Sequence, residues 1–237
     1  MSLETRGIRS LKKHIAGLLY QDDLDKALEE LCRLPGLQAV NPLFSLLLHQ
    51  EEKPRWRAVI AMGVVVKNLA DTNMEGGRTV MRRLMWSLNE ESGGIGWGAP
   101  EAMAEIMACH EGLAEEFSAV FTSYMDKAGN FLEYEVLQRG VLWGLARLAV
   151  ARPDLVRGAV AHVGKYLEST DAAVRGLAAR AAGLLMAANV RPQLQALVDD
   201  NAEFRSFIDT QLVNLRVGEV AEQALASLDR GNARTVD

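Results

Sequence analysis

The residues best suited to chemistry lie in one glycine-rich stretch, 87–105, with the sequence SLNEESGGIGWGAPEAMAE. Glycine permits positive φ and close approach of the backbone to a ligand, and binding residues concentrate on loops held by a rigid scaffold. Trp97 is therefore predicted either to be presented by this loop as a binding residue or to be tucked inward as a plug of the core. Both interpretations stay open. The glycines of the stretch are Gly93, Gly94, Gly96 and Gly98.

Acidic residues flank Trp97 on both sides. Glu101 and Glu105 are one helical turn apart and share a face, and with Glu90 and Glu91 their oxygens could ligate a divalent cation. The spacing is not that of an EF-hand loop, so a solvated acidic face is favoured, and we predict neither a metal nor a cofactor. The same acids exclude a phosphate-binding loop, because they would repel phosphate and no lysine follows the glycines.

Composition sets limits on the function. The 237 residues are 49% hydrophobic and 24% charged, as in soluble globular proteins. The net charge of -5 argues against a dedicated nucleic-acid binder. No apolar run approaches the ~20 residues that span a bilayer, so no membrane association is expected. Cys32 and Cys109 lie far apart, which fits a reduced, cytoplasmic setting, and the Cys109-His110 pair alone does not make a zinc site.

Helical periodicity dominates the chain, and strand-like alternation is nearly absent. Five prolines stand just before apolar runs, at the first-turn position where proline is tolerated, and Asn41 is a candidate cap. These prolines are Pro42, Pro54, Pro100, Pro153 and Pro192. The predicted helices span 3–20, 24–34, 42–49, 54–70, 76–88, 99–110, 113–125, 134–151, 153–167, 171–188, 192–197, 203–215 and 218–228.

An internal repeat organises these helices. A large residue, a tiny one and a small or aliphatic one recur at the start of the second helix of each pair. The tiny residues are Ala58, Gly98, Gly140 and Gly176, with Gly218 as a degenerate fifth copy. Their spacing of about 40 residues is typical of two-helix repeats, in which a tiny residue lets neighbouring backbones approach. Such pairs bury their apolar faces only by stacking.

The segment 171–184, DAAVRGLAARAAGL, resembles the second half of a HEAT repeat. The resemblance implies an all-α, right-handed α-solenoid of about five HEAT-like helix pairs, in which the second helices line the concave face. We expect one domain over 1–237. Its predicted parts are N-terminal capping helices in 1–37, repeats in 38–230 and a tail in 231–237.

The same resemblance implies roles for the arginines. In HEAT repeats an Asp and an Arg pair between neighbouring units as a ladder, and Asp171 and Arg175 match that pattern. Arg57 and Arg139 match only the Arg. A structural ladder is the favoured role of these three arginines, and the alternative is recognition of carboxylate or phosphate on the concave face.

A HEAT-like repeat is often a binding scaffold, so the first hypothesis is a non-enzymatic module that holds a protein partner on its concave face and on the loop 89–100. Trp97 would be the aromatic anchor. The candidate binding residues are Glu90, Glu91, Gly94, Gly96, Trp97, Glu101, Arg82, Arg83, Arg139 and Arg175.

Two alternatives remain. HEAT-like DNA glycosylases that act on alkylated bases place a Trp and an acid one turn apart, with an Arg about one repeat later. Trp97, Glu101 and Arg139 resemble that constellation, although the family's acid is Asp. The other alternative, suggested only by the repeat type, is a small-ligand or chromophore-lyase-like protein. Whether the chain is an enzyme stays open, with the non-enzymatic reading favoured.

Overall fold

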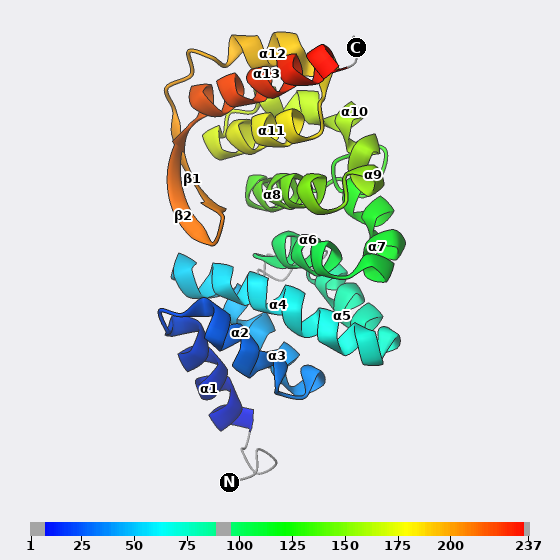
Figure 1. Cartoon of the computed structure of the whole chain (residues 1–237), viewed down its shortest axis with the longest axis vertical. Helices are drawn as coiled ribbons and strands as arrows, with labels where there is room; N and C mark the ends of the chain where they lie inside the picture. Colours follow the sequence, from blue (N-terminus) through cyan, green and yellow to red (C-terminus); the bar gives the residue numbers. More distant parts are fainter. Residues whose placement is uncertain (1–7, 89–95, 235–237) are drawn as a thin grey trace. The chain divides into compact units, whose positions relative to one another are not determined.

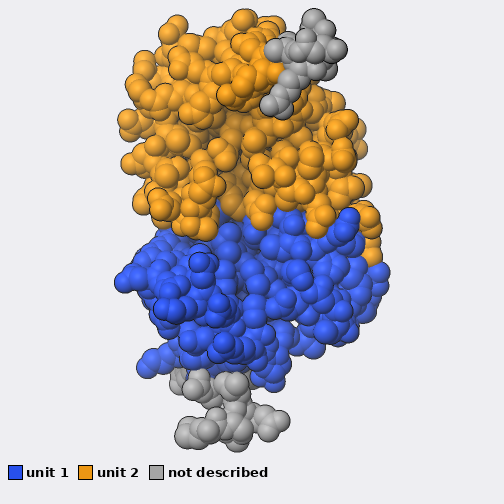
Figure 2. Space-filling view, viewed as in Figure 1, with its two compact units in different colours: residues 1–113 blue, residues 114–237 orange. Residues whose placement is uncertain are grey.

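The structure of the protein is a computed structural model that describes residues 8–88 and 96–234. Helices make up most of it (Figure 1). The chain divides into two compact units, Met1–Leu113 and Ala114–Asp237, which Figure 2 shows in separate colours. No helix in the described part of the chain is long and apolar enough to cross a membrane.

The first unit is built around its longest helix, α4. The helices of this unit are α1 (Ile8–Tyr20), α2 (Leu24–Cys32), α3 (Gly36–Leu47), α4 (Glu52–Thr72), α5 (Met74–Ser87) and α6 (Ala99–Cys109). α4 packs against all the others, and its core side chains include Met62 and Val66. Local capping defines two of the helix starts: Asp23 accepts the N–H of Lys26, and Asn73 accepts that of Gly76.

The second unit stacks the second helices of three successive pairs. Its elements are α7 (Glu111–Ser123, which begins at the end of the first unit), α8 (Glu135–Ala151), α9 (Pro153–Val156), η2 (Arg157–Ala159), α10 (Val160–Val163), η3 (Gly164–Glu168), α11 (Ala172–Leu184), η4 (Ala188–Val190), α12 (Arg191–Ala196), β1 (Glu203–Ile208), β2 (Gln211–Arg216) and α13 (Val217–Arg234). α11 packs between α8 and α13 (Figure 1). The predicted tiny residues Gly140, Gly176 and Gly218 lie near the starts of these three helices.

The prediction of a helix over 203–215 is wrong, because this segment is an antiparallel β-hairpin. Asp209 and Thr210 adopt φ of 48° and 64°, the left-handed region that a two-residue hairpin turn requires. Phe204 and Phe207 of β1 are buried. Burial of these two aromatic side chains in the second unit favours a strand pair over a helix. The sheet is a small addition to an otherwise all-α repeat fold.

Two smaller predictions also need correction. Pro42 lies inside α3, which begins at Gly36 after the N-cap Pro35, so Pro42 does not open a helix and Asn41 does not cap one. The predicted helix 153–167 is broken into short α and 3₁₀ turns. Gly158 and Gly164 lie in that stretch and lower its helix propensity.

Candidate functional site

The backbone before α6 runs close to the ends of two other helices of the first unit. A Cβ built on Gly96 would lie 2.6 Å from the carbonyl oxygen of Ser87, at the end of α5. Gly98 has a φ of 75° and is the N-cap of α6, and its Cβ position is 3.2 Å from Leu47 of α3. These two glycines are therefore needed for close packing and for a left-handed cap. They fix the position of Trp97 between them.

Trp97 lies at the surface of the first unit, with 40% of its area exposed. A side chain this exposed does not act as a buried core plug, which was one of the two predicted roles. The part of the loop that precedes it falls outside the described residues, and so do the candidate site residues Glu90, Glu91 and Gly94.

Glu101, in the first turn of α6, is the acid with the most unusual surroundings. Its Oε2 atom is buried and has no hydrogen-bond partner. Burial raises the pKa of Glu101 to about 7, and the N–H of its own backbone and the positive charge of Arg55 offset only part of this rise. Arg55 of α4 is shared with Glu52, whose carboxylate lies 3.7 Å away. Glu101 is therefore partly protonated near neutral pH.

Glu105, one turn further along α6, is 4% exposed and has internal contacts. Cys109 lies with its Sγ 3.6 Å from the Glu105 carboxylate. The Nδ1 atom of His110 accepts the N–H of Leu113 at 3.1 Å, so this histidine has a structural role at the start of α7. Within residues 8–88 and 96–234 no group of three or more His, Cys, Asp or Glu side chains could hold a metal ion.

The two arginines that precede the glycine stretch already have partners within the first unit. Arg82 donates to Glu75 at 2.6 Å. Arg83 donates to the Asn41 side chain, and its guanidinium lies 4.0 Å from the centre of the Phe44 ring. Both contacts fix these cations on the surface formed by α3 and α5.

The second unit contains the predicted Asp–Arg ladder. Arg139 of α8 donates to Asp171 at the start of α11, with Nε 3.1 Å from Oδ1. Arg175 of α11 donates to Asp200 at 2.8 Å. Each of these two arginines therefore binds the acid of the following repeat. Because Arg139 is held in this way, its surroundings give the glycosylase-like constellation no support.

Arg57 of the first unit has a different structural role. Its guanidinium donates to the carbonyl oxygens of Leu19 at 3.1 Å and of Asp22 at 3.2 Å, and also to that of Gln21. These carbonyls lie at the C-terminal end of α1 and just beyond it, where helix carbonyls lack intrahelical partners. Arg57 therefore caps α1 instead of extending the ladder.

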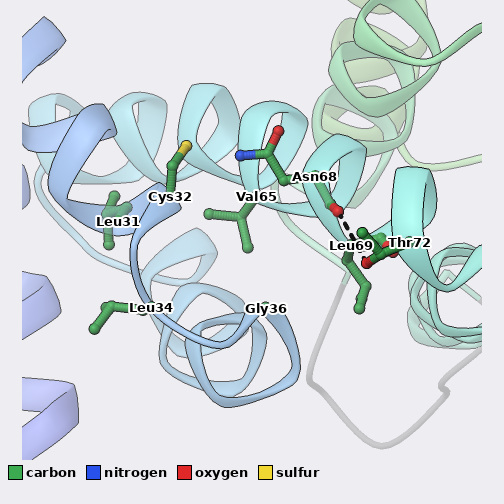
Figure 3. A pocket seen from close by; sticks show the side chains of 8 residues that line it. All are labelled: Leu31, Cys32, Leu34, Gly36, Val65, Asn68, Leu69 and Thr72. Atoms are coloured by element: carbon green, nitrogen blue, oxygen red, sulfur yellow. Dashed lines mark hydrogen bonds between the residues drawn. The ribbon is translucent and has the colours of Figure 1, made fainter. Parts of the chain in front are cut away.

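A small cavity in the first unit has no counterpart in the sequence predictions (Figure 3). It has a volume of about 200 Å³ and lies between α2, the start of α3 and α4. Burial raises the pKa of Cys32, which is one of the residues that line it, so this thiol is poorly nucleophilic. The lining residues are Leu31, Cys32, Leu34, Gly36, Val65, Asn68, Leu69 and Thr72. Ligand pockets of ~300–1,000 Å³ are usual, so this space is small for a cofactor.

Comparisons with known proteins agree with the repeat architecture. No protein-family model matches the chain. A stretch of 126 residues, 52% of the chain, is 32% identical to an uncharacterized protein of Archaeoglobus fulgidus and covers 60% of that relative's length.

Two similar solved structures, both of designed proteins, cover nearly the whole chain. One is an engineered protein with a TM-score of 0.53 and 18% identity, covering 92% of this chain and 98% of that one. The other is a designed armadillo repeat protein in complex with the peptide (KR)4, with a TM-score of 0.52 and 18% identity, covering 92% of this chain and 99% of that one. The chain therefore has an armadillo-type helical-repeat fold.

Proposed function

We propose that the protein is a non-enzymatic repeat scaffold that binds an extended, basic segment of a protein partner through Trp97 and Glu101 of its first unit. The observation that carries the proposal is the buried, unpartnered Oε2 of Glu101, four residues after a surface-exposed indole. A buried carboxylate oxygen without a hydrogen bond lowers stability, and an incoming donor would remove that cost.

The chemistry of the partner follows from which charged groups remain available. Arg82, Arg83, Arg139 and Arg175 are all bound to groups of this chain, so an acidic partner would have to break existing contacts. A carboxylate and an indole face both attract a cation. The net charge of -5 also favours approach of a basic segment. The partner's contact groups are therefore Lys or Arg side chains.

The repeat fold supports an extended form of the ligand. The second helices of stacked pairs form a continuous face, and α4 and α6 are the second helices of this unit. The structure of the designed armadillo repeat protein with the same fold is of a complex with the basic peptide (KR)4. A peptide of that sequence is a suitable first probe for this chain, because it carries the predicted charge without any folded structure of its own.

The test is a titration of fluorescein-labelled (KR)4 into wild type, Trp97→Ala and Glu101→Gln. We expect each substitution to weaken binding by about fivefold, the effect of losing roughly 1 kcal/mol of cation–π or charged hydrogen-bond energy. Trp86→Ala is the matched control, because Trp86 is 80% exposed on α5 and has no part in the proposed site. Glu115→Gln controls for loss of one surface charge.

Two results would contradict the proposal. One is equal affinity of (KR)4 for wild type, Trp97→Ala and Glu101→Gln. The other is an equal loss of affinity in the Trp86→Ala or Glu115→Gln controls, which would mean that the peptide responds to any surface ring or to net charge alone. An acidic peptide of the same length, (ED)4, is expected to show no binding.

A further inference from the structure

The β1–β2 hairpin packs on the second helices of its own unit. It is inserted between α12 and α13, and β1 contacts α11 (Figure 1). The Phe204 ring lies directly over Gly176 of α11, where an added Cβ would overlap the ring. Trp143 of α8 donates its indole N–H to the carbonyl oxygen of Phe207 at 2.6 Å. One aromatic ring in a glycine notch and one main-chain hydrogen bond therefore hold an extended strand on α8 and α11.

The register of the hairpin explains how a main-chain carbonyl of β1 points toward Trp143. Ile208 pairs with Gln211 across the two-residue turn. Main-chain groups of successive residues in an antiparallel pair point alternately toward and away from the partner strand. Phe207 therefore directs its carbonyl away from β2. A single extended peptide would offer the same carbonyl, and main-chain bonds combined with side-chain pockets are a common mode of peptide recognition.

The docked hairpin also has features that oppose its docking. Ser206 is 3% exposed, and its Oγ is buried without a hydrogen-bond partner. Thr210 of the turn has a φ of 64°, a left-handed value that β-branched residues seldom adopt, so the closed hairpin also carries a local backbone cost. One contact favours docking: the negative charge of Asp209 attracts the half-buried guanidinium of Arg180 on α11. The hairpin is thus attached by specific contacts and carries local costs, at Ser206 and in the turn, that its release and unfolding would relieve.

We propose that the hairpin is an intramolecular occupant of a peptide-binding face on α8 and α11. An extended partner segment with one aromatic side chain, equivalent to Phe204, takes the place of β1 when the hairpin opens. The inference rests on the proposed function only in assigning extended segments to second helices. It uses neither Trp97 nor Glu101.

The test changes the hairpin and the binding face on α8 and α11 in separate variants. Phe204→Ala/Phe207→Ala removes the ring that lies over Gly176 and a second buried ring of β1, and leaves the residues of α8 and α11 unchanged. A labelled peptide with the sequence of residues 203–208, EFRSFI, is then titrated into wild type and this variant. Hydrogen exchange of the amides of 203–216 reports opening. Adding Gly176→Ala fills the notch on the face, and adding Gly158→Ala is the matched control, because a Cβ there meets nothing within 4 Å.

The proposal predicts that the hairpin amides of the double variant exchange at least tenfold faster than in wild type, with α13 amides unchanged. The peptide binds the double variant at least tenfold more tightly than wild type, and Gly176→Ala abolishes this gain while Gly158→Ala does not. Hairpin amides that stay as protected as in wild type would overturn the proposal. So would an opened hairpin with no gain in peptide affinity, or a gain that survives Gly176→Ala.

Two controls keep the outcome interpretable. Circular dichroism melting shows whether the double variant is folded. Trp143→Phe removes the indole N–H and keeps an aromatic ring, so it provides a second opened form for the exchange measurement. Binding of (KR)4 is measured on the same variants and is expected to match wild type. Failure of wild type to bind (KR)4 counts against the proposed function, whereas failure of EFRSFI to bind the opened variant counts against the hairpin proposal.

Discussion

Arg139 of α8 and Asp171 at the N-cap of α11 form an ion pair that joins two successive second helices, with Nε 3.1 Å from Oδ1. The same carboxylate accepts the N–H of Val174 at 2.9 Å and so caps α11. One side chain therefore stabilises both the start of a helix and the interface between repeats.

Asp171→Ala removes both interactions, so we expect it to destabilise the protein by about 2 kcal/mol, the sum of a lost cap and a lost charged hydrogen bond. Arg139→Ala removes only the ion pair. The Arg139 side chain is 44% exposed, so solvent screening reduces the expected loss to about 0.5 kcal/mol. Urea denaturation measures both, and equal losses would contradict the double role of Asp171.

The contribution of Asp171 to the stability of the fold should disappear in acid. Burial raises the pKa of Asp171, but the bonds from Arg139 and from backbone N–H groups outweigh it, and the pKa lies below 3.8 in the folded state. Because the folded pKa is lowered, the stabilisation is present above pH ~4 and is lost as the pH falls through the folded pKa. The stability difference between wild type and Asp171→Ala should shrink between pH 5 and pH 2. A constant difference over that range would contradict the ion pair.

Two glycine substitutions in the first unit should change the free energy of unfolding in opposite directions. A Cβ on Gly63 of α4 would lie 2.7 Å from Cγ of Glu105 and 3.1 Å from Sγ of Cys109, so Gly63→Ala should destabilise by about 1–3 kcal/mol. A Cβ on Gly17 of α1 meets nothing within 4 Å. Gly17→Ala should therefore stabilise by up to about 1 kcal/mol through helix propensity. Thermal denaturation distinguishes them, and a neutral Gly63→Ala would show that α4 and α6 are not in close contact.

The hairpin turn offers a stabilising change. Thr210 has a φ of 64°, so Thr210→Gly should stabilise the protein by about 1 kcal/mol by relieving a conformation that β-branched residues resist. Thr170→Gly is the control, since Thr170 is not among the residues with positive φ, and it should destabilise through greater freedom of the unfolded chain. Loss of stability in Thr210→Gly would contradict the left-handed turn.

The fold could be predicted because the sequence patterns that indicate it are local. Helical periodicity and tiny residues at about 40-residue intervals placed the second helices, and Ala58, Gly140, Gly176 and Gly218 do lie near the starts of α4, α8, α11 and α13. The predicted role of the tiny residues, close approach of neighbouring helix backbones, is wrong for two of them. Gly176 admits the Phe204 ring, and Gly218 approaches the carbonyl of Val198, so neither contact is between two helices.

The hairpin was not predictable on the same basis. Its turn, Asp209-Thr210, lacks the Asn-Gly or Asp-Gly pair that marks hairpin turns. The buried positions of β1 do not alternate regularly, because Phe207 is buried next to Ser206. The strand is specified by tertiary contacts with Gly176 and Trp143, which are distant in sequence.

The candidate site was predicted only in outline. The sequence indicates that Trp97 and Glu101 are near each other, but burial of a single carboxylate oxygen depends on how α6 packs. The partners of the arginines likewise depend on tertiary structure. Arg83, for example, reaches Asn41 on another helix.

Glu101 should also make stability depend on pH. Burial raises its pKa from 4.5 to about 7, so the folded state holds the proton more tightly than the unfolded state. Stability from this group is fully present below pH ~4.5 and is lost as the pH rises through 7. Glu101→Gln should therefore be more stable than wild type at pH 8, by at most about 3 kcal/mol, and not at pH 4. A difference that does not vary with pH would contradict the buried carboxylate.

The most direct test of the central claim is calorimetric titration of (KR)4 into wild type and Glu101→Gln at pH 6 and pH 8. A cation binds the ionised carboxylate. With a pKa of about 7, the ionised fraction rises nearly tenfold over this range, so wild type should bind up to about tenfold more tightly at pH 8. Glu101→Gln should show the same weaker affinity at both pH values. Equal affinities of wild type at the two pH values, or the same pH dependence in Glu101→Gln, would contradict recognition of a basic segment by Glu101.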